Sequence, residues 1–219
     1  MLVSWEEVLS EEINAQVHRL AQALASKHGI EALIPAYSSL LVRFNLLEVE
    51  AQELIPQIWR LAEEVLEKAR EGEIGASISR IPVCYQAGLG PDLSSAAQYL
   101  GISEEELVRQ HCQPQYHTYM IGFIPGFGYL GKLPFAKSIP RKQVPRDRVG
   151  EGSVGLAGWQ TGIYPSQSSG GWQIIGKTPY QMAKFDGNRW HFRLQPGDKV
   201  QFFPISPEDW DEWAAKGRL

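Results

Sequence analysis

The fold is decided by a stretch at residues 153–179, SVGLAGWQTGIYPSQSSGGWQIIGKTP. Short apolar runs alternate here with turns rich in Gly, Pro and Ser, a pattern typical of β structure that changes direction every few residues. Similar runs stand outside this stretch, YHTYMIGFI at 116–124 and KVQFFPI at 199–205. Together these runs predict a closed or nearly closed β-barrel.

The two parts of the 219-residue chain differ in composition. Only three of the 21 Gly and two of the 14 Pro lie in residues 1–80, whereas five of the seven Trp lie beyond them. Helices exclude Gly and Pro from their interiors, and β-turns use them. We therefore predict a small α+β domain at 1–80, followed at 81–219 by a β-barrel domain with short helices at its start and end.

The first part shows both helical and strand periodicity. Ser10 suits a helix N-cap, and Pro56 fits the second helix only if it lies in the first turn. Strands are predicted at 30–37, 39–44 and 76–85. The apolar residues at helical spacing form two sets: Ile13, Val17, Leu20 and Leu24, then Leu54, Ile58, Leu61 and Val65.

Three helix starts are predicted in the second part. Asp92 caps the first helix, and Ser103 with Glu106 forms a capping box for the second. Ser206 caps a terminal helix that has Pro207 at its first position.

Composition excludes several classes of protein. The net charge of −4 disfavours nucleic-acid binding, which needs clustered Lys and Arg. No apolar run reaches the roughly 18 residues of a membrane span, and the N-terminus lacks a signal peptide. We predict a cytoplasmic protein in which Cys84 and Cys112 are buried thiols.

Two motifs that resemble catalytic sites are interpreted as structural. Residues 171–178 match the phosphate-binding loop GxxxxGK[ST], but no strand precedes them and Pro179 disfavours a following helix. We predict a strand that ends in Lys177. His111, Cys112 and His117 are close in sequence, but zinc needs at least three suitably placed ligands, so we favour structural histidines and predict no metal site.

Two stretches suggest a ligand site. Residues 122–134 interleave Phe123, Phe127 and Tyr129 with Gly and Pro, which fits either a plug at a barrel end or the wall of a cleft. Residues 140–172 concentrate Arg and then amide and hydroxyl donors, which suits a carboxylate or phosphate ligand, although surface Arg with turn-forming Ser explains the pattern equally well.

These stretches resemble the family of 5-oxoprolinase B subunits (PxpB), which also contains the kinase inhibitor KipI and the first-subunit half of allophanate hydrolase-type proteins. The resemblance covers nearly the whole chain and implies an N-terminal α+β domain and a C-terminal cyclophilin-like barrel. The motifs that carry it are GFIPGFGYL (122–130), PRKQVPRDRV (140–149), residues 153–179, IPVCY (81–85), GPDL (90–93) and PGDKVQFFPI (196–205).

Two positions depart from the family pattern. The family begins with a segment ahead of its first strand, whereas here Met1 falls inside that strand, which leaves an incomplete sheet or a misplaced start as alternatives. Lys177 stands where the family usually has Arg, and this difference creates the match to the phosphate-binding loop.

The resemblance implies one subunit of an ATP-dependent 5-oxoprolinase, which opens the lactam 5-oxoproline to L-glutamate. ATP, with Mg²⁺, is then a co-substrate, and the partners are the A subunit of the enzyme together with its KipA-like C subunit. The alternatives are a KipI-like inhibitor of a sensor histidine kinase and one subunit of an allophanate- or urea-type amide hydrolase.

Motif position and chemical type together select the expected site residues. His111 is the candidate for proton transfer, and Phe127 and Tyr129 shape the cleft. The cleft is expected between residues 122–131 and 140–171, with Arg146 facing solvent. The remaining substrate-binding candidates are Arg146, Gln160, Thr161, Tyr164, Ser169 and Lys177.

Overall fold

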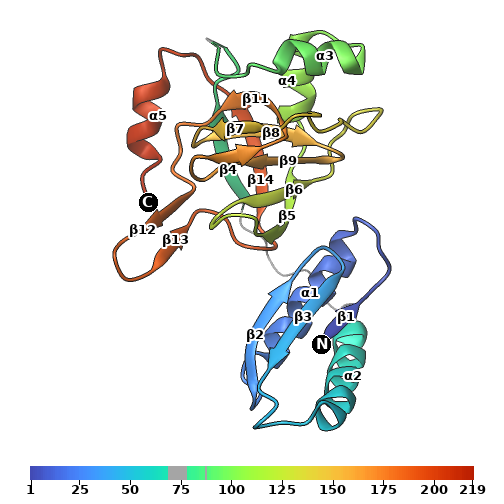
Figure 1. The fold of residues 1–219 in the computed structure, drawn as a ribbon. Helices are drawn as coiled ribbons and strands as arrows, with labels where there is room; N and C mark the ends of the chain where they lie inside the picture. Colours follow the sequence, from blue (N-terminus) through green and yellow to red (C-terminus); the bar gives the residue numbers. More distant parts are fainter. Residues whose placement is uncertain (69–77, 87) are drawn as a thin grey trace. The chain divides into compact units, whose positions relative to one another are not determined.

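The chain forms two units, Met1–Ala76 and Ser77–Leu219, in a computed structural model (Figure 1). The structure describes residues 1–68, 78–86 and 88–219. The expected boundary between residues 80 and 81 falls inside strand β4 (Ile78–Val83), which belongs to the second unit. None of the described helices has both the length and the hydropathy that a membrane crossing requires.

The first unit is an antiparallel sheet packed against two helices. Its strands are β1 (Leu2–Ser4), β2 (Ile30–Pro35) and β3 (Ser39–Phe44), in the order β1-β3-β2. Helices α1 (Glu11–Leu24) and α2 (Ala51–Lys68) pack most of their predicted apolar stripes with Leu40 and Val42 of β3, although Ile13 is only half-buried. The Ser10 cap is confirmed, since its hydroxyl accepts a hydrogen bond from the N–H of Ile13 at 3.3 Å.

Pro56 departs from the prediction because it lies in the second turn of α2 rather than the first. A proline there leaves the carbonyl of Gln52 without its intrahelical partner. Both side chains are exposed, so water can hydrogen-bond that carbonyl and the helix continues through the proline.

The second unit is built on a seven-stranded sheet that curls into a barrel, as predicted (Figure 1). The strand order is β11-β8-β9-β6-β5-β14-β4. Besides β4, its strands are β5 (Tyr116–Ile121), β6 (Gly128–Gly131), β8 (Ser153–Ala157), β9 (Gln160–Ile163), β11 (Gln173–Lys177) and β14 (Lys199–Pro204). The strand predicted to end in Lys177 is therefore confirmed as β11.

Backbone hydrogen bonds between the two outermost strands close the barrel. Cys84 and Lys177 exchange two of them, at 2.8 and 2.9 Å. Gly176 is required at this seam, because a Cβ there would meet Val83 at 2.8 Å and the carbonyl oxygen of Cys84 at 3.0 Å. The backbone of Lys177 thus takes part in closing the barrel, and this fixes the position of its Cα atom.

Helices α3 (Leu93–Leu100) and α4 (Glu104–Cys112) pack on the barrel and contribute to its core. The hydroxyl of Ser103 accepts a hydrogen bond from the N–H of Glu106, which confirms that cap. Gly90 brings the chain so close to β11 that a Cβ there would lie 2.1 Å from the carbonyl oxygen of Ile175. This approach places the start of α3 directly over β11.

Two further antiparallel strand pairs and one helix complete the unit. They are β7 (Arg146–Val149) with β10 (Ser168–Gly170), β12 (Ala183–Phe185) with β13 (Trp190–Phe192), and α5 (Trp210–Lys216). The prediction for the start of the terminal helix is wrong: Asp209 is its N-cap, and the hydroxyl of Ser206 donates to the Asp209 carboxylate at 2.9 Å.

Candidate functional site

Asp92 is the hub of a buried ion cluster in the second unit. It occupies the N-cap position of α3, but its carboxylate makes no capping hydrogen bond. It accepts hydrogen bonds from Lys142 Nζ at 2.9 Å, from both terminal nitrogens of Arg146 at 2.7 Å, and from the backbone N–H of Ile174 at 2.7 Å. The predicted N-cap position of Asp92 is therefore confirmed, but its side chain does not cap the helix, because the carboxylate accepts hydrogen bonds from these donors instead.

The ion cluster keeps Asp92 ionised. Burial would raise the pKa of this carboxyl, but hydrogen bonds from Arg146, Lys142 and the backbone of Ile174 outweigh it and lower the pKa below its usual value. The same bonds raise the pKa of the Arg146 guanidinium. The cluster joins α3, β11 and the segment that leads into β7, so it holds three elements together.

Arg146 is not solvent-facing as expected. Its side chain is 28% exposed, and it makes a two-pronged contact with a carboxylate that is 4% exposed. A guanidinium that makes two hydrogen bonds to one carboxylate is held in a fixed orientation. Its acceptor here is Asp92, a residue of this protein and not a ligand.

Four aromatic side chains pack edge to face beside this cluster. Phe127 contacts Tyr129, Tyr164 and Trp172 at centroid distances of 4.9, 5.2 and 5.3 Å. Phe127, Tyr164 and Trp172 are buried, whereas Tyr129 keeps part of its surface exposed. The structure therefore brings residues 122–131 and 140–171 together as expected, but largely as a packed core.

Phe123 is the most exposed side chain of this aromatic region, at 59%. Its ring meets Phe127 edge-on at 5.7 Å, and its backbone has φ of 66°. This left-handed conformation costs a non-glycine residue free energy, and such strain concentrates at functional loops. Burial raises the pKa of the neighbouring Tyr129, and the positive charge of Arg141 partly offsets this rise.

His111 lies in the barrel interior and is fully buried. Nδ1 is 2.8 Å from the hydroxyl of Tyr85, Nε2 is 2.9 Å from Oγ1 of Thr161, and the ring stacks on Phe202. Burial lowers the pKa of His111 to about 3, so the imidazole is neutral at physiological pH. Tyr116 adds a hydrogen bond from its hydroxyl to the carbonyl of His111.

Three further expected substrate-binding residues differ in their burial. Thr161 points into the barrel toward His111 and is fully buried. Gln160 is half-buried at the start of β9, and Ser169 is exposed on β10. Among residues 1–68, 78–86 and 88–219, no three His, Cys, Asp or Glu side chains form a group that could hold a metal ion.

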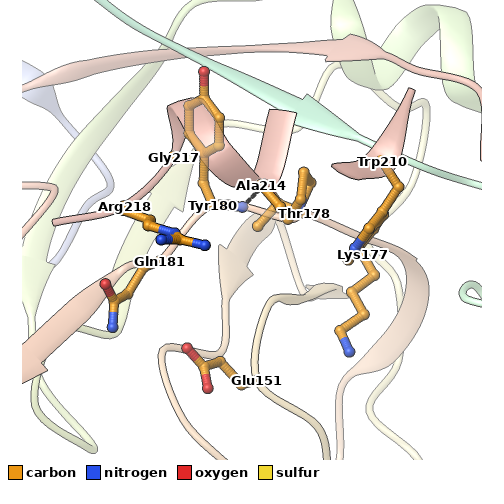
Figure 2. A pocket seen from close by; sticks show the side chains of 10 residues that line it. Glu151, Lys177, Thr178, Tyr180, Gln181, Trp210, Ala214, Gly217 and Arg218 are labelled. Atoms are coloured by element: carbon orange, nitrogen blue, oxygen red, sulfur yellow. Dashed lines mark hydrogen bonds between the residues drawn. The ribbon is translucent and has the colours of Figure 1, made fainter. Parts of the chain in front are cut away.

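Lys177 lines a different feature, a cavity of about 450 Å³ beside α5 (Figure 2). We call it the α5 cavity. Figure 2 shows Glu151 and Arg218 at its margins and Trp210 beside Lys177. It is lined by Glu151, Lys177, Thr178, Pro179, Tyr180, Gln181, Trp210, Ala214, Gly217 and Arg218.

Comparison with known proteins identifies the family. The family described as "Carboxyltransferase domain, subdomain C and D" matches residues 1–193. The chain belongs to this family. Curated members similar to it include the 5-oxoprolinase B subunit of Bacillus subtilis, 38% identical over 96% of this chain and 91% of that protein. The protein of the same name from Escherichia coli O157:H7 is 39% identical over 86% of this chain and 84% of that one.

Two solved structures share the fold of this chain. The protein TTHA0988 superimposes with a TM-score of 0.80 at 33% identity over 94% of this chain, which spans only 39% of that longer protein. The Pyrococcus horikoshii protein PH0987 is 38% identical, with 95% of both chains covered and a TM-score of 0.56. The curated relatives confirm the resemblance to the family of 5-oxoprolinase B subunits.

Sequence reasoning missed Asp92 as an ion-pair hub and the C-terminal wall of the α5 cavity. The GPDL stretch carried a usable signal, since Gly90 permits the close approach to β11 that puts Asp92 within reach of Ile174. Arg218 had no such signal, because a single basic residue near a chain end is unremarkable until α5 places it opposite Lys177.

Proposed function

We propose that this chain is the B subunit of an ATP-dependent 5-oxoprolinase that converts 5-oxoproline to L-glutamate. The observation that carries the proposal is the 38% identity with the B subunit of Bacillus subtilis 5-oxoprolinase across nearly the full length of both chains. Relatives at 38–39% identity from two further bacteria bear the same name.

The chemistry explains the need for ATP. The lactam carbonyl is an unactivated amide, so water attacks it slowly. Transfer of the γ-phosphoryl group of ATP to the amide oxygen yields ADP and a phosphorylated imidate. One water adds to that carbon, and the ring C–N bond breaks as the nitrogen takes up a proton, which leaves an acyl phosphate. A second water then cleaves the acyl phosphate to the carboxylate and inorganic phosphate. Mg²⁺ bound to the nucleotide would neutralise charge on the transferring phosphoryl group.

The candidate ligand residues of this chain would bind and orient the anionic substrate. Cationic and amide donors at fixed positions stabilise anions where water is partly excluded. Asp92 already neutralises Arg146, so the basic candidate that remains for the substrate is Lys177 at the α5 cavity. His111 would act by holding Thr161 and Tyr85 in place, since it is neutral and lies away from solvent.

The assembly is part of the proposal. The names of the relatives designate one subunit of a larger enzyme, and in TTHA0988 the matching region is 39% of a longer chain. We infer that an A subunit, together with a KipA-like C subunit, completes the enzyme. The 22% identity with yeast urea amidolyase is a weaker likeness and favours the oxoprolinase over a urea-type activity.

Reconstitution tests this function. The chain should be co-expressed with the A- and C-subunit homologues of its own genome, and glutamate release from 5-oxoproline measured with and without ATP. We expect ATP-dependent turnover by the complex and none by the chain alone or by a complex that lacks it. Turnover by the isolated chain would contradict the proposed division of labour. An inactive complex, with this chain inhibiting autophosphorylation of a sensor kinase, would favour the KipI-like role.

A further inference from the structure

The α5 cavity combines two cations and one carboxylate that are not neutralised within the fold. In the part of the chain that the structure describes, Lys177, Arg218 and Glu151 form no ion pair, although all three line the same cavity. Lys177 Nζ lies over the ring of Trp210, 5.9 Å from its centroid. The charged groups of Lys177, Arg218 and Glu151 are therefore available to bind a charged molecule.

The walls of the cavity are fixed by hydrogen bonds. The carbonyl of Gly217 accepts from the backbone N–H of Gln181 at 3.0 Å and from Arg193 at 2.6 Å. Gly217 also packs so tightly on Tyr180 that an added Cβ would lie 2.2 Å from its ring. On the other side, the backbone of Lys177 belongs to the barrel closure. Arg218 and Lys177 thus project from two anchored backbones.

We propose that the α5 cavity binds a small molecule in which a carboxylate lies beside an N–H donor. This chemistry is shared by a lactam acid such as 5-oxoproline and an α-amino acid such as glutamate. The inference deepens the proposed function and rests on it for the choice of ligands. Lys177 and Arg218 would bind the carboxylate, Glu151 would accept the N–H, and Trp210 with Ala214 would contact the carbon skeleton.

Charge and volume favour this class over a nucleotide triphosphate. The lining carries two positive charges and one negative charge, which complements one carboxylate beside one N–H donor. A triphosphate has several negative charges and would be repelled by Glu151, and this cavity offers no glycine-rich loop of backbone N–H donors. A volume of 450 Å³ lies in the range of ~300–1,000 Å³ usual for small-molecule pockets.

Calorimetric titration of the full chain tests the assignment with four probes. These are 5-oxoproline, L-glutamate, cyclopentanecarboxylate, which retains a five-membered ring and the carboxylate but lacks N–H, and inorganic phosphate. We expect 5-oxoproline or glutamate to bind at least tenfold more tightly than the other two probes, because each lost charge-assisted hydrogen bond costs about tenfold or more in Kd. The tighter of the two identifies the physiological source.

Three variants and one control connect binding to the cavity. Lys177→Gln and Arg218→Gln should each weaken binding about tenfold or more, and Glu151→Gln should weaken only the probes with an N–H. Arg189→Gln, at the exposed turn between β12 and β13, should bind like the wild type. Equal affinities in all variants, or phosphate binding that tightens in Glu151→Gln, would overturn the proposal.

The assembled complex separates this inference from the proposed function. Lys177→Gln or Arg218→Gln should raise the KM for 5-oxoproline about tenfold in the reconstituted enzyme. An active complex with unchanged KM in both variants would overturn the site and leave the function standing. An inactive complex, together with an isolated chain that still binds 5-oxoproline through these residues, would overturn the function and leave the site.

Discussion

The two ends of β11 differ in whether the nearby basic side chains form ion pairs with carboxylates of the protein. Near Ile174, the cations Lys142 and Arg146 converge on the buried carboxylate of Asp92. At the other end, Lys177 opens on a cavity where no described carboxylate pairs with it. The first arrangement uses charge to hold α3, β7 and β11 together, and the second leaves charge for a ligand. A basic residue therefore indicates a binding site only when its counter-ion is not already part of the fold.

The largest effect is expected from Asp92→Ala. This change leaves two cations and the backbone N–H of Ile174 without their acceptor inside a partly buried site. We expect a loss of about 3 kcal/mol in the free energy of unfolding, the low end for a broken buried pair, because the cations keep some contact with water. Chemical denaturation measures the loss.

Asp147→Ala is the matched control, since this neighbour of Arg146 is an exposed carboxylate on β7. Surface changes of this kind stay within about 0.5 kcal/mol. Equal stability of the Asp92 and Asp147 variants would show that the Asp92 cluster contributes little to folding. The contrast between a structural cluster at Ile174 and a binding site at Lys177 would then fail.

A pH titration tests the buried polar network around His111. The folded protein binds this proton only below pH about 3, whereas the unfolded chain binds it near pH 6.5. The unfolded state therefore takes up a proton that the folded state excludes, and the free energy of unfolding falls as the pH falls below 6.5. The contribution is about 1.4 kcal/mol per pH unit.

The slope between pH 6.5 and 5 separates this histidine from the carboxylates, which titrate lower. His111→Gln should show a slope smaller by one proton, even if its stability at pH 7 is also reduced. An unchanged slope in His111→Gln would mean that His111 is protonated in the folded state.

Arg146→Lys should have a smaller effect than either of these changes. Lysine keeps the charge but replaces two aligned hydrogen bonds to Asp92 by one. We expect a loss of about 1 kcal/mol, measured as a lower midpoint in the same denaturation experiment. Arg148→Lys, on the exposed surface of β7, is the control. Wild-type stability with a raised KM in the assembled enzyme would instead assign Arg146 to the substrate.

Periodicity and turn residues were sufficient to predict the main elements. The stripe from Ile13 to Leu24 and the alternation at 39–44 depend on local burial patterns, which sequence reports directly. The barrel followed from short apolar runs between glycine-rich turns. The start of α5 was misplaced because Ser206 and Pro207 suit an N-terminus locally, while the Ser206 hydroxyl bonds to Asp209 instead.

Site geometry was less predictable because it depends on pairs far apart in sequence. Asp92 and Arg146 are 54 residues apart, and His111 and Thr161 are 50 apart. A local reading assigns Asp92 to a helix cap and Arg146 to the surface, and only the packing of α3 on β11 brings them together. Chemical type identified residues able to bind anions, but it could not say which of them the fold already neutralises.

The smallest effect is expected from Lys177→Arg, which keeps the charge at the α5 cavity. The backbone of Lys177 closes the barrel in either case, and its side chain is only half-buried, so the free energy of unfolding should change by less than about 0.5 kcal/mol. The KM for 5-oxoproline in the assembled enzyme should stay within a few-fold of wild type, because a guanidinium also binds a carboxylate.

Lys177→Met is the matched comparison, since it retains most of the length of the side chain without the charge and should raise KM while leaving stability intact. A loss of several orders of magnitude in kcat for Lys177→Arg, with the fold unchanged, would show that the ammonium group itself is required. A loss of stability in both variants would make the two ends of β11 alike, with both cations serving the fold.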